Sequence, residues 1–263
     1  MKYGTGLQHF YKAFPERFFD VGIAEQHAVT FSAGLASQGK LPVFAVYSSF
    51  LQRSYDQLIH DCAIAKRHVV VGIDRGGFVG EDGETHHGLF DVAMLTTVPG
   101  VTVYSPSDTA ELSQCLEQAL YKDKGVVAVR YPRGCELYRS GTKAYSDFRH
   151  VSNKSRKLIF TYGRISAYAY TIPGVDVLQA IKIFPIADEI IDICLAYDEI
   201  YAFEEGEREG GIAQKLCNSL ALAGYKGSFT ITAVDGFVRH AYVATQLHNA
   251  MLDADGMRKI TGE

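Results

Sequence analysis

The chain has 263 residues, of which 47% are hydrophobic, so it can bury a core and is long enough for two domains. Its formal net charge is −4 and the sequence has no run of basic residues, which excludes nucleic acid as a partner. No apolar run approaches the roughly 18 residues of a membrane span, and no signal-peptide pattern is present, so we expect no membrane contact. The five scattered cysteines indicate reduced thiols and a cytoplasmic protein.

The first part of the chain alternates strand-like and helix-like patterns. Short β-branched runs predict buried parallel strands at 18–21, 43–46, 69–73, 101–104 and 126–130. Longer apolar patterns predict helices at 24–38, 50–65 and 109–122. The last helix has Ser107 or Asp108 as its N-cap and Glu111 in its first turn.

A polar segment without periodicity separates two regions of this kind. We interpret residues 135–156 as a linker between a first domain, residues 1–134, and a second, residues 157–263. The second region predicts strands at 157–162, 177–181, 200–203 and 228–233, and helices at 187–196, 211–223 and 245–251. This alternation predicts an α/β fold with two domains, each a mainly parallel sheet flanked by helices.

Glu25 occupies an unusual place for a carboxylate, directly after a predicted strand and at the start of a long apolar helix. The surrounding sequence is Gly-Ile-Ala-Glu-Gln-His-Ala. In the simpler interpretation Glu25 complements the dipole of its helix. In the other, a largely desolvated carboxylate shares a proton with a weakly basic ligand nitrogen.

A second strand-to-helix junction carries the sequence Tyr-Ser-Ser-Phe-Leu-Gln-Arg and places Tyr47, Phe50 and Arg53 close together. Ligands of open α/β sheets gather at such junctions, and a flat ligand ring needs an aromatic face. The alternatives are that Phe50 packs in the core and that Arg53 pairs with Asp56 or Asp61 on a helix surface.

A glycine-rich segment after the strand at 69–73 contains Arg75, Asp82 and His86, which suits a loop that approaches a ligand. A metal site is the rival interpretation, but neighbouring histidines do not easily converge on one ion. Arg133 follows the strand at 126–130, where a guanidinium can grip a phosphate with two bonds. Without a ligand, Arg133 would be only the first charge of the linker.

These segments resemble the pyrimidine-binding domain of thiamine-diphosphate enzymes, and most closely that of the 1-deoxy-D-xylulose-5-phosphate synthases. The resemblance implies that Glu25 bonds to the aminopyrimidine ring of the cofactor and is catalytic. It implies that Phe50 stacks on this ring and that Tyr47 contacts both the cofactor and the substrate channel. Arg53 would face the same channel.

The same resemblance implies that Arg75 and Arg133 bind the phosphate of glyceraldehyde 3-phosphate, and that Asp82 and His86 are catalytic groups at its hydroxyl and carbonyl. The enzyme would be a transferase that joins pyruvate to this acceptor, releases CO₂ and makes an isoprenoid and thiamine precursor. In the second region, Glu204-Glu205 resembles a family motif, but we assign no catalytic residue there.

The diphosphate-binding motif of that family, Gly-Asp-Gly followed by an asparagine, is absent from this sequence. The resemblance covers about the carboxy-terminal half of a synthase and begins after the first strand and helix of its pyrimidine domain. We therefore expect Mg²⁺ on a diphosphate domain from another chain, a homodimer of this one, and no activity alone.

Alternative interpretations remain open. The chain could be the β subunit of a 2-oxoacid dehydrogenase or part of a split transketolase. It could also be a fragment, or a non-catalytic truncated paralogue that acts as a binding module.

Overall fold

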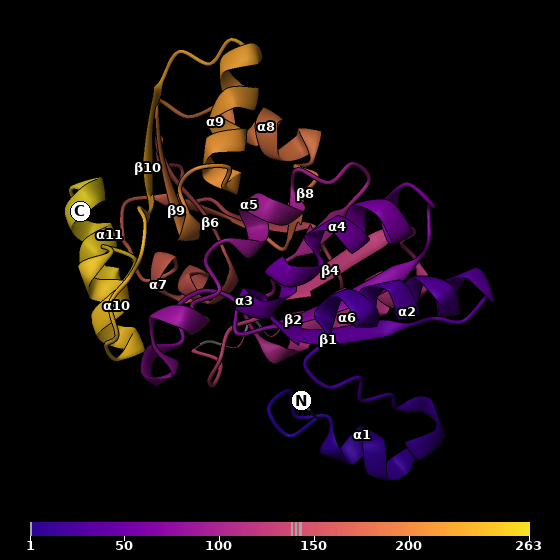
Figure 1. Cartoon of the computed structure of the whole chain (residues 1–263). Coiled ribbons are helices and arrows are strands. Elements are labelled where there is room, and N and C mark those ends of the chain that lie inside the picture. The colour runs from indigo at the N-terminus through magenta and orange to yellow at the C-terminus, as the bar shows by residue number, and fades with distance from the viewer. Residues whose placement is uncertain (1, 138, 140, 142–143) are drawn as a thin grey trace.

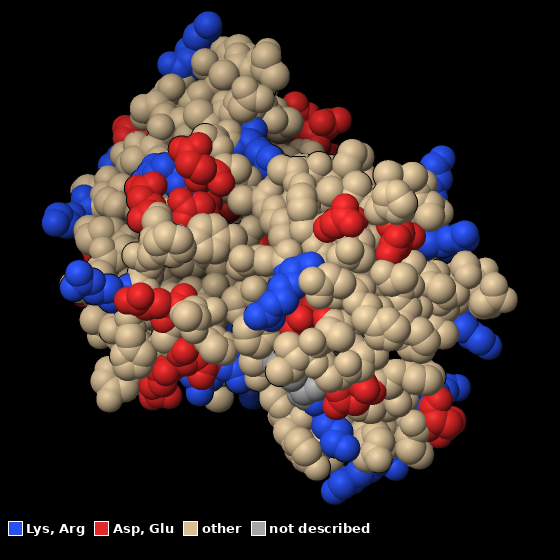
Figure 2. Space-filling view, viewed as in Figure 1, with Lys and Arg blue, Asp and Glu red and all other residues tan. Residues whose placement is uncertain are grey.

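The computed structural model describes residues 2–137, 139, 141 and 144–263. It contains two five-stranded sheets with helices packed on their faces, which confirms the predicted α/β class (Figure 1). No described helix is both long enough and apolar enough to cross a membrane. Figure 2 shows basic and acidic side chains interspersed over the face that it draws.

The first sheet is parallel except at one edge and has the strand order β1-β2-β4-β3-β8. Its strands are β1 (Val43–Tyr47), β2 (Val69–Asp74), β3 (Thr102–Tyr104), β4 (Val126–Arg130) and the antiparallel β8 (Lys182–Phe184). All five residues of β4 are buried, as expected for a central parallel strand of β-branched residues. Its helices are α2 (Glu25–Ser37), α5 (Asp91–Leu95) and α6 (Thr109–Tyr121).

The strand predicted at residues 18–21 is wrong, because this segment is irregular in the structure. Within the described residues β1, at the edge of the first sheet, pairs with β2 alone, so residues 18–21 form no strand beside it. Before this segment lie α1 (Gln8–Ala13) and the 3₁₀ turn η1 (Pro15–Arg17), neither of which was predicted. Figure 1 shows α1 set apart from the body of the molecule, and none of its residues is buried.

The helix predicted at residues 50–65 is present as an unbroken helical segment, residues 48–63, but the type of helix changes along the chain from α to 3₁₀, back to α and then to π. Its parts are α3 (Ser48–Leu51), the 3₁₀ turn η2 (Gln52–Ser54), α4 (Tyr55–Gln57) and the π-helical η3 (Leu58–Ala63). The glycine-rich loop likewise contains two 3₁₀ turns, η4 (Gly80–Asp82) and η5 (Glu84–His86). π-Helical turns and 3₁₀ segments of this kind are frequent beside functional sites.

The second sheet has the strand order β10-β9-β6-β7-β5. Its strands are β5 (Phe148–Val151), β6 (Lys157–Tyr162), β7 (Asp176–Ala180), β9 (Glu199–Glu207) and β10 (Ser228–Val234). β5 lies inside the segment interpreted as a linker and pairs antiparallel with β7. The helices here are the 3₁₀ turn η6 (Gly163–Ile165), α7 (Ser166–Ala169), α8 (Asp188–Cys194), α9 (Ile212–Leu222), α10 (Val243–Asn249) and α11 (Ala254–Thr261).

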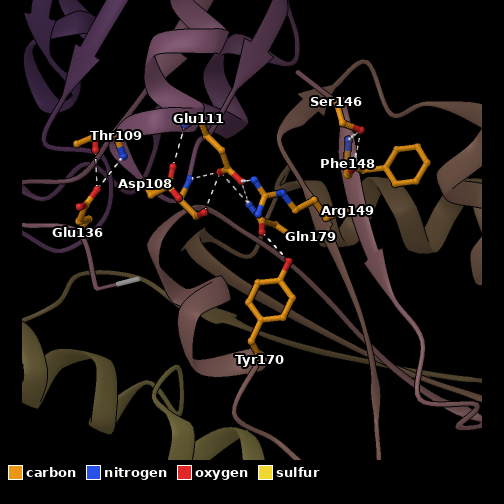
Figure 3. Close-up of polar contacts among 10 residues, drawn as sticks. Asp108, Thr109, Glu111, Glu136, Ser146, Phe148, Arg149, Tyr170 and Gln179 are labelled. Atoms are coloured by element: carbon orange, nitrogen blue, oxygen red, sulfur yellow. Dashed lines mark hydrogen bonds and ion pairs between the residues drawn. The ribbon is translucent and has the colours of Figure 1, made fainter. Parts of the chain in front are cut away.

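The two halves of the chain contact each other through a shared sheet, a shared hydrophobic cluster and polar side chains. β8, from the second half, completes the first sheet, and one hydrophobic cluster runs from Val29 in α2 to Leu220 in α9. Figure 3 shows a buried polar cluster at the same junction: Glu111 Oε1 at the start of α6 lies 2.8 Å from Arg149 Nη2 on β5. Gln179 Nε2 on β7 donates to Glu111 Oε2 at 3.0 Å. The halves are therefore packed into one body.

Candidate functional site

Glu25 begins helix α2 and is 8% exposed, so its carboxylate is nearly desolvated. Its Oε1 lies 3.3 Å from Nη1 of Arg53, whose own side chain is half exposed. No side chain caps α2, and the unpaired N–H groups at its start favour a negative charge at this point. Glu25 is thus a buried carboxylate at a helix terminus with an arginine at its open side.

Tyr47, Phe50 and His86 form an aromatic group next to this carboxylate. β1 ends at Tyr47 and α3 begins at Ser48, so Phe50 faces back over the end of the strand. The Tyr47 and Phe50 rings stack with centroids 5.6 Å apart, and the His86 ring meets Phe50 edge-on at 5.3 Å. The Arg53 guanidinium lies 5.1 Å from the centroid of Phe50, which links this group to Glu25.

Two arginines and an aspartate lie on the other side of Tyr47. The Arg75 guanidinium sits 4.0 Å from the Tyr47 ring centroid and forms an ion pair with Asp82. Arg133 Nη1 lies 3.3 Å from Asp82 Oδ1 and donates to the carbonyl of Val79 at 3.0 Å. Asp82 therefore stands between two guanidinium groups, which could hold an anion in its place.

These contacts join the eight side chains singled out from the sequence into one continuous cluster, whose members are Glu25, Arg53, Phe50, His86, Tyr47, Arg75, Asp82 and Arg133. The cluster runs along the carboxyl ends of β1, β2 and β4. Open α/β sheets bind ligands at this edge. The roles assigned to the individual residues stay predictions.

Several buried polar atoms beside the cluster have no hydrogen-bond partner among the described residues. They include the hydroxyls of Ser48 and Ser49, which precede Phe50, and Nε of Arg75. Buried polar groups are normally paired, so these atoms suit a site that receives a polar ligand. Asp74, at the end of β2, has its pKa raised by burial.

His87 is buried, whereas the side chain of its neighbour His86 packs against Phe50 in the cluster. It is only 4% exposed, and its Nδ1 accepts a hydrogen bond from the N–H of Val79 at 3.2 Å. Burial lowers the pKa of His87, so the imidazole is held neutral.

Within the described part of the chain, no three His, Cys, Asp or Glu residues lie close enough to hold a metal ion.

Sequence reasoning missed a set of buried charges behind the cluster. Arg130, at the end of β4, donates through Nε to Asp91 Oδ2 at 2.9 Å, and solvent reaches neither side chain appreciably. From the second half, Arg164 and Glu205 form a buried ion pair in the same region. A signal was available for Arg130, which is a charge at the end of a run that otherwise reads as a buried strand. Glu205 gave no such signal, because it follows the strand predicted at 200–203 within a charged stretch.

Comparisons with known proteins identify what this chain is similar to. Residues 1–136 match the family described as "Transketolase, pyrimidine binding domain". The 1-deoxy-D-xylulose-5-phosphate synthase of Chlorobaculum tepidum is 43% identical over 277 aligned residues, covering 98% of this chain and 43% of that protein. The synthase of Clostridium kluyveri is 51% identical over 172 residues, covering 64% of this chain and 27% of its own length.

A solved structure, "Split gene transketolase, inactive beta4 tetramer", matches with a TM-score of 0.81 and 23% identity, covering 94% of this chain and 84% of that one. At this identity the likeness shows the fold alone. The chain spans less than half the length of the curated synthases that it matches. The resemblance to the synthases drawn from the sequence motifs is confirmed. The chain therefore belongs to the family of the transketolase pyrimidine-binding domain, and it is similar to part of the length of the 1-deoxy-D-xylulose-5-phosphate synthases.

Proposed function

We propose that this chain is the pyrimidine-side half of a 1-deoxy-D-xylulose-5-phosphate synthase that is inactive until another polypeptide supplies a diphosphate-binding domain. The observation that carries this proposal is the continuous cluster from Glu25 to Arg133. One end offers a carboxylate and an aromatic ring, as a pyrimidine requires. The other end offers two guanidinium groups, as a phosphorylated acceptor requires.

At the first end, Glu25 would hold the ring nitrogen of the cofactor pyrimidine and Phe50 would stack on the ring. The burial of Glu25 suits this task, because a desolvated carboxylate readily shares a proton with a weak base. When bound, thiamine diphosphate supplies the carbon nucleophile of the reaction. Mg²⁺ and the diphosphate would be held by the completing domain.

At the second end, Arg75 and Arg133 would grip the phosphate of glyceraldehyde 3-phosphate in place of Asp82, their present partner. His86, which touches Phe50, lies at the aromatic end of the cluster, so it could exchange a proton with the acceptor carbonyl. Asp82, once released from the arginines, could accept a hydrogen bond from a substrate hydroxyl. Tyr47 and Arg53 would line the channel between the two ends.

The assembly we propose is a homodimer of this chain, completed by separate diphosphate-domain chains in the cytoplasm. The structurally similar split-gene transketolase is an inactive tetramer of β chains, which supports such a dependence. A 2-oxoacid dehydrogenase β subunit would not need paired arginines at the acceptor end, so we favour the synthase over that alternative.

The test is a calorimetric titration of thiamine diphosphate with Mg²⁺ into this chain, alone and with the diphosphate-binding domain of the Chlorobaculum tepidum synthase. We expect tight binding only in the mixture, its loss in Glu25→Ala and Phe50→Ala, and formation of 1-deoxy-D-xylulose 5-phosphate from pyruvate and glyceraldehyde 3-phosphate. A mixture that neither binds the cofactor nor makes product would overturn the proposal and favour a binding module.

A further inference from the structure

The glycine-rich loop, residues 76–88, carries Asp82 and His86, and two of the side chains that hold its backbone, Glu205 and Arg164, come from the second half of the chain. Glu205 on β9 is 3% exposed and reaches across to this loop. Its Oε1 accepts the N–H of Phe78 at 2.7 Å, and its Oε2 accepts Nε of Arg164 at 2.9 Å. The carboxylate thus links the start of the loop to the second sheet.

Arg164, in η6 directly after β6, holds two segments of the candidate site at once. Its Nη2 donates to the carbonyl of Phe78 at 2.9 Å, and its Nη1 donates to the carbonyl of Arg133 at 3.3 Å. Arg75 precedes the loop by one residue. One guanidinium therefore bonds to the carbonyl of Arg133 and to that of Phe78, near the start of the loop that follows Arg75.

The two ends of the loop are fastened to each other. Gly77 and Gly88 exchange backbone hydrogen bonds of 2.7 and 2.8 Å, and Arg130 Nη2 donates to the Gly88 carbonyl at 3.0 Å. Gly77 has a φ of +83°, and a Cβ atom there would collide with the Glu205 carboxylate. The loop can therefore approach Glu205 this closely only through a glycine.

We propose that Glu205 and Arg164 are positioning residues of the candidate site. In this proposal they set the separation of the Arg75 and Arg133 guanidinium groups, so that both can grip one phosphate. A buried loop needs partners for its backbone groups, and bonds from an ionised side chain are the stronger kind. We call this pair the Glu205–Arg164 clamp.

The chain provides a matched control in the adjacent residue, Glu204, which is 1% exposed. Its carboxylate accepts the hydroxyl of Tyr162 at 2.7 Å and the N–H groups of Ile212 and Ala213 at 2.9 Å each. Glu204 thus caps α9 within the second half, whereas Glu205 holds the loop. Glu204→Gln and Glu205→Gln are the same chemical change on the same strand with different expected consequences.

The first measurement is amide hydrogen exchange of the two variants in the free chain. Glu205→Gln should speed exchange at Phe78 and along the glycine-rich loop by at least about tenfold, because a bond to a charged acceptor is weakened. Glu204→Gln should leave the loop at the wild-type rate. Equal loop exchange in Glu205→Gln and wild type would overturn the clamp.

A second variant tests the clamp independently, in case Glu205→Gln does not fold. Arg164→Lys keeps the positive charge beside Glu205 but cannot reach the carbonyls of Phe78 and Arg133 together. It should speed exchange in the same loop, with β6 and β9 still protected. Faster exchange spread evenly over both sheets would show a general loss of structure instead and would count against positioning.

The second measurement rests on the proposed function and uses the completed enzyme. Glu205→Gln should raise KM for glyceraldehyde 3-phosphate at least about tenfold while kcat and KM for pyruvate change little, since only phosphate binding is displaced. A uniform fall in kcat with both KM values unchanged would contradict the clamp. An inactive wild-type mixture would reject the proposed function, and the exchange comparison would still decide the clamp.

Discussion

Several charged side chains in this core form ion pairs, and Asp91 with Arg130 is the clearest case. Their side chains are 0% and 5% exposed, and the Arg130 guanidinium also donates to the carbonyls of Gly88 and Glu205. Burying a charge is costly, so removing one partner leaves the other uncompensated. The pair holds the end of β4 against α5 behind the candidate site.

We predict that Asp91→Asn lowers the free energy of unfolding by about 3–5 kcal/mol, because Arg130 stays buried without its counter-ion. Urea denaturation followed by circular dichroism measures the change. The control is Asp235→Asn, which breaks an ion pair with Arg208 at 2.8 Å whose aspartate is 67% exposed. That variant should lose no more than about 1 kcal/mol. Equal losses in the two variants would contradict the prediction.

In contrast to Asp91, Glu25 should matter for activity and hardly for stability when it is substituted. In the completed enzyme we expect Glu25→Gln to lower kcat at least about 100-fold, because a neutral amide cannot take part in proton transfer. The melting temperature should hardly move, since the described ion pair of Glu25 is with a half-exposed arginine. Steady-state kinetics and thermal melts of the same samples test this, and full activity would refute the role.

The lowered pKa of His87 predicts that the free energy of unfolding depends on pH. Burial lowers its pKa in the folded protein, so as the pH falls the unfolded chain takes up the proton first. Its stabilising effect is complete above the unfolded pKa of about 6.5 and is lost as the pH falls toward and through the folded value.

In urea denaturation at pH 5.5 and 7.5, His87→Gln should therefore show a smaller loss of stability at the lower pH than the wild type. His60→Gln, which removes a histidine whose side chain is 77% exposed, is the control and should follow the wild type. A wild-type slope in His87→Gln would contradict the assignment.

Helix α6 illustrates how far an element can be predicted from its own sequence. Asp108 Oδ1 accepts the N–H of Glu111 at 2.8 Å, and Glu111 Oε2 accepts the N–H of Ser107 at 2.7 Å, so the predicted N-terminus is confirmed. The partners of Glu111 on β5 and β7 could not be predicted, because β5 is a short edge strand of four residues, none of them buried. Short polar edge strands give little periodic signal.

We predict that Glu111→Ala lowers the free energy of unfolding by about 2–4 kcal/mol, because it leaves the buried amide of Gln179 and the partly buried guanidinium of Arg149 without their carboxylate partner (Figure 3). Glu117→Ala, at a more exposed position of the same helix, should change it by less than about 0.5 kcal/mol. Chemical denaturation decides this, and a similar small change at both positions would refute the role of Glu111.

The same contrast holds for the candidate site. Motifs at strand ends grouped Phe50, Arg75 and Arg133, because parallel strands bring their carboxyl ends to one edge. Glu25 follows an irregular segment, and its place at the start of α2 was the signal for it. The Glu205–Arg164 clamp was not predicted, since Phe78 and Glu205 are 127 residues apart and no local pattern encodes such a contact. The strand prediction at 18–21 was wrong for a related reason: a strand forms only where a neighbouring strand pairs with it, and residues with a high β propensity are not sufficient.

At the scale of the whole molecule, the halves are joined by a shared sheet, a shared core and polar contacts. β8 pairs with β3, and the cluster that contains Val29 also contains Leu220. Glu111 with Arg149 and Arg130 with the Glu205 carbonyl cross the same junction. Such an interface is too extensive for two independently folding units.

We therefore predict that the chain unfolds in a single cooperative transition. The sequence has no tryptophan but 16 tyrosines, so tyrosine fluorescence reports tertiary structure and far-ultraviolet circular dichroism reports helices. Both signals should change at the same urea concentration. Residues 1–137 produced alone, without β8, should show no cooperative transition. Two separate transitions in the full chain would contradict the prediction.

The outer edge of β1 has a practical consequence. Within the described residues this strand pairs on one side only, and Leu41 and Val43 at its start are 41% and 51% exposed. An open apolar edge of this kind is a template for other chains, so a concentrated sample should lose protein to aggregation on storage. A lysine at Val43 should slow that loss, and so should co-expression with a partner that covers the edge.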